Sequence, residues 1–230
     1  MAVEVKICGL MSEAALGAAL EGGADYVGFV FYPPSPRSLS PAEAGRLAQL
    51  ARGRAQVVAL FVDPDDALLD EVMREVDPDL IQLHGKELPE RVAAIKAEYG
   101  RPVMKAISVE TQADADRAFD YQGAADLFLF DAKPPRGMTG ALPGGNGISF
   151  DWRSLEGVRG RVRFMLSGGL NPGNVAEAIR LVSPDAVDVS SGVEVRPGEK
   201  DPALIREFLR AAKGAIGTVE TSADMEMRSV

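Results

Sequence analysis

The chain alternates short apolar runs with longer amphipathic segments along most of its length. We expect strands at eight runs rich in Val, Ile, Leu and Phe: Val3–Ile7, Tyr26–Phe29, Gln56–Phe61, Leu80–Leu83, Val103–Ile107, Leu127–Phe130, Phe164–Leu166 and Ala186–Val189. These runs show little polar alternation, which is typical of parallel strands that are buried on both faces. They begin about 25 residues apart, which is the length that a strand, a crossover helix and two short loops require.

Helical patterns with recognisable ends lie between these runs. Ser12 caps a first helix that Gly22-Gly23 closes, and Ser40-Pro41 leads into a second. We expect helices over 42–52, 65–76, 88–99, 111–121, 173–182 and 201–212. The sixth connection differs from the others, because Gly137–Gly147 is a glycine-rich loop and only Trp152–Leu155 is briefly helical after it.

Eight strands that alternate with helices predict an α/β fold, a single-domain (β/α)8 TIM barrel. The alternative is a doubly wound open sheet, but the chain has no glycine-rich dinucleotide fingerprint after an early strand. We expect the barrel to span residues 1–217. Residues 218–230 are polar and follow the last helix, so we expect them to form a disordered tail.

Composition narrows the classes of function. The 25 Lys and Arg residues face 34 Asp and Glu residues, and the net charge of −9 argues against a nucleic-acid binder. A single Cys cannot form an internal disulfide, and one Cys with one His makes a structural metal site improbable. The longest apolar run, Val57–Val62, is too short to span a membrane. We therefore expect a cytoplasmic protein without a metal site, and no feature of the sequence marks an obligate protein partner.

The chemistry of a (β/α)8 barrel sits at the C-terminal ends of its strands. Six of the expected strand ends carry polar, titratable or glycine-rich groups: Lys6-Ile7-Cys8-Gly9, the segment from Phe31 to Arg37, Gln82-Leu83-His84-Gly85, Phe130-Asp131, Ser167-Gly168-Gly169 and Asp188-Val189-Ser190-Ser191-Gly192. All of these groups would converge on one mouth of the barrel.

The side chains at these ends have both structural and functional interpretations. Cys8 is either a small buried hydrophobe or, with a lowered thiol pKa, a base or nucleophile. Asp131 is either an acid or a helix cap. His84 either binds a ligand or forms a hydrogen bond with loop backbone. Arg37 lies in a proline-rich loop, where it is either a surface residue or a bidentate clamp for a carboxylate.

Glycine pairs follow the last two expected strands. Gly168-Gly169 and Ser191-Gly192 would let the backbone approach a ligand, or would simply form tight turns. Loops after the seventh and eighth strands commonly hold phosphate in this architecture, so their adjacency favours a phosphate site.

With these residues in view, the chain resembles the phosphoribosylanthranilate isomerase family. The resemblance runs in order over residues 3–213 and rests on these segments: Lys6-Ile7-Cys8-Gly9, Gly28-Phe29-Val30-Phe31 with Ser35-Pro36-Arg37, Gln82-Leu83-His84-Gly85, Leu129-Phe130-Asp131, Gly144-Gly145-Asn146-Gly147 with Phe150-Asp151-Trp152, Leu166 to Pro172 with Asn174-Val175, and Val187 to Glu194. Each segment alone would be a weak signal, whereas the ordered set is specific.

The resemblance implies a cofactor-free Amadori rearrangement of N-(5′-phosphoribosyl)anthranilate, a step of tryptophan biosynthesis. It implies that Asp131 is the general acid and Cys8 the general base. Substrate contacts would come from Arg37, which would meet the anthranilate carboxylate, and from Gln82 and His84. The phosphate would rest on backbone N–H groups of Gly168, Gly169, Ser191 and Gly192, and the loop with Gly144, Gly145 and Asn146 would close over the substrate. The family commonly has Thr or Ser in place of Asn146.

Other barrels fit the sequence less well. Indole-glycerol-phosphate synthase is longer and uses a lysine with glutamate partners, for which no motif is present. Ribulose-phosphate epimerases hold a metal with two histidines, and this chain has one. A binding-only phosphosugar barrel would have lost Cys8 or Asp131. Isomerisation of the related histidine-pathway substrate would require a second phosphate loop after strands three and four, where paired glycines are missing.

Overall fold

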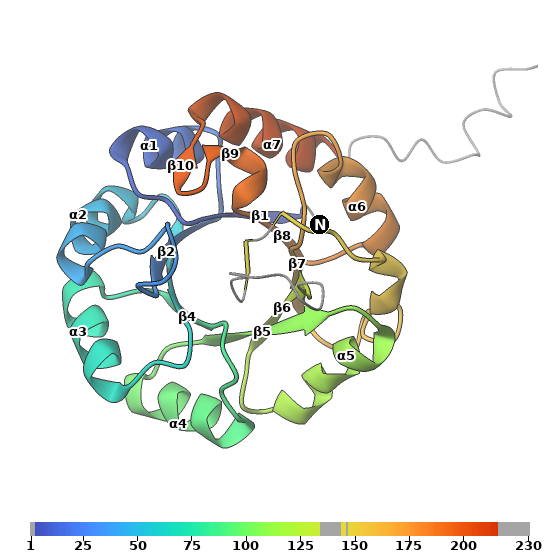
Figure 1. Ribbon diagram of the computed structural model, residues 1–230, viewed down its shortest axis with the longest axis horizontal. Helices are drawn as coiled ribbons and strands as arrows, with labels where there is room; N and C mark the ends of the chain where they lie inside the picture. The colour runs from blue at the N-terminus through green and yellow to red at the C-terminus, as the bar shows by residue number, and fades with distance from the viewer. Residues whose placement is uncertain (1–2, 134–143, 146, 216–230) are drawn as a thin grey trace, which may run out of the picture.

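The computed structural model describes residues 3–133, 144–145 and 147–215. Eight parallel strands close into a barrel in chain order, with helices around it (Figure 1). The strands are β1 (Glu4–Cys8), β2 (Tyr26–Phe31), β3 (Gln56–Phe61), β4 (Leu80–Leu83), β5 (Val103–Val109), β6 (Leu127–Ala132), β7 (Phe164–Leu166) and β8 (Ala186–Val189). The predicted fold class is confirmed: the chain forms a (β/α)8 TIM barrel.

The helices follow the predicted pattern with small shifts at their ends. They are α1 (Glu13–Glu21), α2 (Pro41–Ala51), α3 (Asp66–Val76), α4 (Pro89–Tyr99), α5 (Gln112–Asp116), α6 (Val175–Val182) and α7 (Pro202–Gly214), with 3-10 turns η1 (Arg117–Tyr121), η2 (Trp152–Leu155) and η3 (Ser191–Val193). Side chains of Ser12, Ser40, Asp65 and Asp201 accept backbone N–H bonds as N-caps.

Two expected helices differ from the observed ones. The single helix expected over 111–121 is a short α-helix followed by the 3-10 turn η1. The helix expected from Gly173 begins at Val175, because Asn171 and Asn174 form a capped turn in which Asn171 N–H donates to Asn174 Oδ1.

Side chains of the strands alternate between two hydrophobic layers. The larger core lies between the strands and the surrounding helices and includes Phe29, Phe61, Phe130 and Phe164. Inside the barrel, a smaller cluster that includes Tyr26, Val58, Met104 and Leu129 fills the lower layers. Buried polar side chains lie above this cluster, toward the carboxyl ends of the strands, and that end carries the site.

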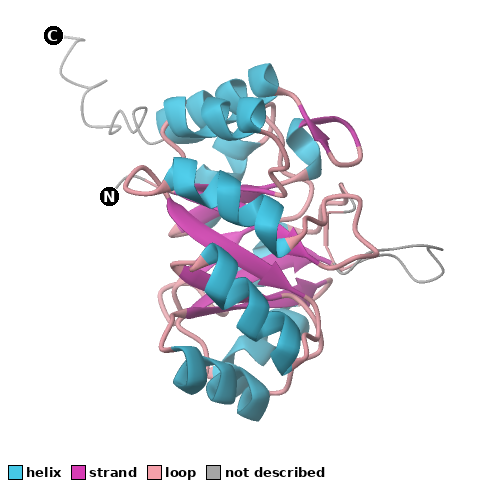
Figure 2. Ribbon diagram, turned by 90° about the vertical axis from the view of Figure 1, so that its left-hand side faces the viewer, coloured by secondary structure: helices cyan, strands magenta, loops and turns pink. Residues whose placement is uncertain are grey.

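A short hairpin, β9 (Glu194–Arg196) with β10 (Glu199–Lys200), was not predicted. It projects from the end of the barrel toward which the strand arrows point (Figure 2). Within the described part of the chain, no helix has the length and apolar character needed to cross a membrane. The expected tail over 218–230 lies outside the described residues.

Candidate active site

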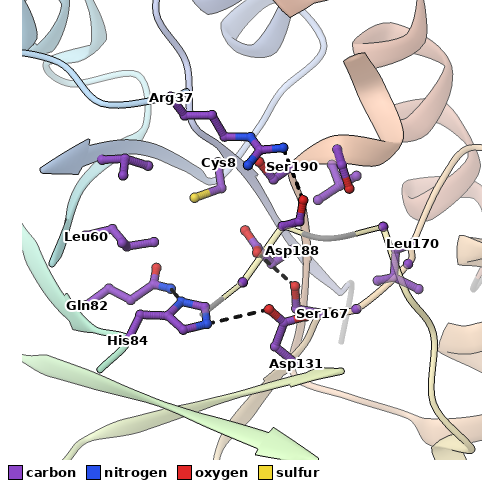
Figure 3. A pocket seen from close by; sticks show the side chains of 18 of the residues that line it. Cys8, Arg37, Leu60, Gln82, His84, Asp131, Ser167, Leu170, Asp188 and Ser190 are labelled. Atoms are coloured by element: carbon purple, nitrogen blue, oxygen red, sulfur yellow. Dashed lines mark hydrogen bonds and ion pairs between the residues drawn. The ribbon is translucent and has the colours of Figure 1, made fainter. Parts of the chain in front are cut away.

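The carboxyl ends of the strands surround a pocket (Figure 3). Nearly all of the predicted site residues line it: Cys8, Arg37, Gln82, His84, Asp131, Gly144, Gly145, Gly168, Gly169 and Ser191. Gly192 is not among the lining residues, and Asn146 lies outside the described residues. Residues from six strand ends thus meet at one site, as the barrel topology predicts.

Asp131, on β6, is buried and one of its oxygens faces the pocket. Its Oδ1 accepts a hydrogen bond from Ala132 N at 2.9 Å, and its Oδ2 lies 3.5 Å from His84 Nε2. Gln82 Nε2 lies 3.1 Å from His84 Nδ1, so the amide donates to Nδ1 and leaves the His84 proton on Nε2, toward Asp131. His84 Nε2 and Gln82 Oε1 are buried without a hydrogen-bond partner among the described residues, which leaves both for a ligand.

Cys8 ends β1 and lies on the other side of the barrel from β6. Its thiol belongs to a small apolar cluster with Val30 and Leu60, against which Tyr32 and Val62 pack. Burial raises the pKa of the Cys8 thiol, and the neighbouring Lys6 ammonium opposes that effect. The pocket therefore has an apolar wall beside Cys8 and a carboxyl group on the wall opposite.

Arg37 is buried by the unpredicted hairpin. Its Nε and Nη2 donate to the two carboxylate oxygens of Glu194 at 2.8 and 2.9 Å, and Nη2 also donates to Gly145 O at 3.2 Å. Lys200 Nζ donates to the same Glu194 carboxylate at 2.5 Å and to Ser190 O at 3.0 Å. The bidentate clamp expected of Arg37 is thus used within the chain, on Glu194, and the described residues provide no hydrogen bond to Nη1.

The loop around Gly144 and Gly145 packs over these side chains. A Cβ at Gly144 would lie 2.7 Å from Asp131 Oδ2 and 2.7 Å from His84 Cε1, and one at Gly145 would lie 2.7 Å from Arg37 Nη1. Gly145 also has a positive φ of 72°. Only glycines allow the backbone to approach the three polar groups this closely.

The glycine-rich end of β7 lies beside Asp131, because a Cβ at Gly168 would be 3.3 Å from Asp131 Oδ1. Gly168 and Gly169 have φ values of 85° and 66°, and among the described residues no acceptor bonds their N–H groups. A Cβ at Gly192 would lie only 1.9 Å from Leu170 O, so this glycine allows the β8 loop to pack against the β7 loop. The geometry gives Gly192 a packing role, and its contact with a phosphate stays a prediction.

The sequence analysis placed Lys6, Ser167 and Asp188 at strand ends and Glu194 in a matching segment without giving them a role, and it did not name Lys200. Glu194 and Lys200 hold Arg37, and Lys6, Asp188 and Ser167 form a buried network below Cys8. A Pro-Gly pair at Pro197-Gly198 is a turn signal that would have indicated the hairpin. Across the described residues, no three His, Cys, Asp or Glu side chains gather as a metal site would require.

Comparisons with known proteins agree over most of the chain. The family model for N-(5′-phosphoribosyl)anthranilate (PRA) isomerase matches residues 5–211. The isomerase of Mesorhizobium japonicum is 56% identical over 215 residues, which cover 94% of this chain and 97% of that protein. That of Paramagnetospirillum magneticum is 57% identical over 214 residues, covering 93% and 99%.

Solved structures give the same result. Phosphoribosyl anthranilate isomerase from Thermotoga maritima superposes with a TM-score of 0.82 at 40% identity, covering 92% of this chain and 99% of that one. A phosphoribosyl anthranilate isomerase in complex with reduced 1-(o-carboxyphenylamino)-1-deoxyribulose 5-phosphate superposes with a TM-score of 0.80 at 38% identity, with coverages of 92% and 99%. A family model and relatives that cover nearly the whole chain leave one conclusion: the chain belongs to the N-(5′-phosphoribosyl)anthranilate isomerase family.

Proposed function

We propose that this chain isomerises N-(5′-phosphoribosyl)anthranilate to 1-(2-carboxyphenylamino)-1-deoxyribulose 5-phosphate in tryptophan biosynthesis, with Asp131 as general acid and Cys8 as general base. One observation carries the assignment of roles. Cys8 and Asp131 reach the same pocket from β1 and β6, two strands that β7 and β8 separate in the closed barrel. An Amadori rearrangement needs an acid and a base that address different atoms of one sugar, and this arrangement supplies both.

The two ends of the pocket match the two ends of this substrate. Arg37 Nη1 is the donor for the anthranilate carboxylate, and the apolar wall of Val30 and Leu60 accommodates the aromatic ring. The N–H groups of Gly168 and Gly169 are donors for the phosphate at the other end. The ribose then lies between Cys8 and Asp131.

The first chemical step is opening of the furanose ring. Asp131 donates its proton to the ring oxygen, the C1–O bond breaks, and the nitrogen lone pair forms a protonated Schiff base. The His84 Nε2–H group, 3.5 Å from Asp131 Oδ2, then stabilises the carboxylate that remains. Gln82 supports this role because it fixes the His84 tautomer.

The second step removes the proton at C2. The Cys8 thiolate takes this proton, and the C–H electron pair neutralises the iminium to give an enolamine. Tautomerisation of the enolamine, in which C1 gains a proton and the C2 hydroxyl loses one, gives the ketone product. The positive charge of the iminium favours the thiolate, which offsets the burial that raises the pKa of Cys8.

The described residues of a single chain supply every group in this scheme, so the proposal requires no protein partner. We place the reaction in the cytoplasm, where the one thiol of the protein stays reduced and available as a base. The loop that contains Gly144 and Gly145 would exclude water from the labile open-chain intermediate.

The test is a fluorescence assay with substrate generated in situ, a chelator present and no metal added. The wild-type chain should turn over, and folded Cys8→Ala and Asp131→Asn variants should each lose about 10²–10⁴-fold in kcat. Asp120→Asn, which removes an exposed carboxylate, is the matched control and should be unaffected. Wild-type binding of the reduced product analogue without turnover would overturn the proposal in favour of a binding protein.

A further inference from the structure

Lys6 is a fully buried lysine inside the barrel, directly below the pocket. It is 0% exposed, and its Nζ donates to Asp188 Oδ1 at 2.9 Å. Lys6 on β1 is in register with Asp188 on β8, so the two side chains extend toward each other across neighbouring strands. An ionised lysine in a barrel interior is costly to bury, and the proposed reaction gives it no step of its own.

The end of the Lys6 side chain lies beside the thiol of Cys8. Both residues point into the barrel from β1, two positions apart, and Cys8 is in register with Gly28 on β2. A Cβ built on Gly28 would lie 3.1 Å from Cys8 Sγ and 3.3 Å from Lys6 Cε. The thiol and the lysine therefore share the space that a side chain at position 28 would occupy.

A second contact fixes the carboxylate that holds this lysine. Ser167 Oγ donates to Asp188 Oδ2 at 3.1 Å, so one oxygen of Asp188 receives Ser167 and the other receives Lys6. Figure 3 shows Asp188 and Ser167 together on the side of the pocket formed by the last two strands. The arrangement holds the ammonium near the thiol without lysine reaching the pocket itself.

We propose that Lys6 is a positioning residue whose ammonium, held by Asp188, stabilises the thiolate form of Cys8 and so prepares it as a base. The proposal rests on the function proposed above, because it gives a source for the anion that the C2 proton transfer needs. Of these two residues, only Cys8 contacts the reacting atoms. Lys6 affects the reaction through its effect on the Cys8 thiol.

The charges around Cys8 have opposing effects. Burial raises the pKa of the Cys8 thiol most, Lys6 lowers it, Asp188 raises it, and Lys200 on β10 lowers it. For Lys6, burial favours the neutral amine, but Asp188 and Cys8 outweigh that effect and raise the pKa, so the ammonium persists at neutral pH.

The other titratable or charged groups on the pocket are Arg37, His84, Asp131 and Tyr32. They line the same pocket from other elements. Changes at Lys6 and Asp188 leave all four in place, so those two substitutions isolate the charges below the thiol.

Alkylation of the protein by iodoacetamide as a function of pH tests the proposal directly. Cys8 is the one cysteine of the chain, so the rate reports the thiolate fraction at a single site. Lys6→Met should move the profile to higher pH and slow alkylation at pH 7 by about tenfold or more. Asp188→Asn should move it to lower pH, and Lys6→Arg should restore much of the wild-type profile.

A matched control removes a lysine from a surface ion pair. Lys96 pairs with Asp126 at 2.6 Å and is about one-third exposed, so Lys96→Met should leave the Cys8 profile unchanged. Opposite shifts of the alkylation profile for Lys6→Met and Asp188→Asn support the proposal. A merely structural defect would not shift the profile in opposite directions when a positive and a negative charge are removed. Unshifted profiles in both folded variants would overturn it.

If Lys6→Met does not fold because Asp188 loses its partner, the double variant Lys6→Met/Asp188→Asn answers the same question. Its profile should lie at higher pH than that of Asp188→Asn alone, and identical profiles would overturn the proposal. The alkylation readout needs no turnover. Shifted profiles together with a fully active Cys8→Ala variant would support the effect of Lys6 on the thiol and would overturn the proposed role of Cys8 as general base instead.

Discussion

The Glu194→Gln substitution separates the positioning of Arg37 from the chemistry. The Glu194 side chain is 4% exposed and accepts charge-assisted hydrogen bonds from Arg37 at 2.8 and 2.9 Å and from Lys200 at 2.5 Å. A glutamine has one acceptor oxygen, so its NH₂ group must face a donor and at least one of these bonds is lost. The expected cost is about 1.5–3 kcal/mol of unfolding free energy. For a chain of this size, that lowers Tm by about 3–12 °C.

Among the kinetic constants, Glu194→Gln should change mainly KM. Arg37 is proposed to meet the substrate carboxylate, away from the reacting atoms, so a less ordered guanidinium weakens ground-state and transition-state binding alike. We expect KM to rise by about tenfold, equivalent to about 1.4 kcal/mol, with kcat nearly unchanged. Steady-state kinetics on the variant and on Glu199→Gln, the exposed partner of Arg196 in the same hairpin, measure this. The control should match wild type.

The stability difference should also depend on pH. Burial opposes ionisation of Glu194, but the hydrogen bonds from Arg37 and the nearby Lys200 charge outweigh it and hold the pKa of Glu194 below its ordinary value. A depressed carboxyl pKa contributes stability that is present above about pH 4.3 and is lost as the pH falls through the lower folded-state value. The Tm gap between wild type and Glu194→Gln should therefore be constant near neutrality and narrow in acid. A lowered KM would refute the reasoning, since it would show that Glu194 competes with the substrate for Arg37.

Three further substitutions test the packing and the buried ion pairs of the fold. Gly192→Ala should destabilise the fold by more than about 1 kcal/mol, because the added Cβ would overlap Leu170 O. Gly17→Ala, in a helix with open space around it, should instead stabilise the fold by about 0.5–1 kcal/mol. Thermal melts that rank the two variants the other way would contradict this account. Lys105→Met should cost about 3–5 kcal/mol in a denaturant titration, because the buried Glu87 carboxylate would lose its ion pair, and a loss under about 1 kcal/mol would contradict this reasoning.

The fold could be predicted from the sequence because each strand is marked by an apolar run in its own segment of the chain. Parallel strands buried on both faces produce continuous apolar runs, and β3, β4, β7 and β8 begin and end where those runs do. The strands β2, β5 and β6 extend two residues further than predicted. In β5 and β6 the last residues enter the mouth of the barrel, where polar side chains such as Ser108 and Asp131 interrupt the apolar run without ending the hydrogen-bonded ladder. The strand β2 instead continues through the apolar pair Val30-Phe31.

The site was partly predictable for a related reason. The strand-end rule identified Cys8 and Asp131 because each follows an apolar run, and the structure brings them to one pocket. The partners Lys6 and Asp188 are 182 residues apart, and their contact depends on the register of β1 with β8 in the closed barrel. Periodicity carries no information on that register. The same holds for Arg37, whose clamp on Glu194 exists only because the β9–β10 hairpin folds back over the barrel mouth.

The most direct measurement of the central claim is the kinetic isotope effect with substrate deuterated at C2. If Cys8 removes that proton, a weakened base should make C–H cleavage limiting, so Cys8→Ser should turn over slowly with a large isotope effect on kcat/KM. Asp131→Asn should be slow with little isotope effect, because its defect lies in ring opening, before C2 reacts. A large isotope effect in Asp131→Asn and none in Cys8→Ser would contradict the assignment of acid and base.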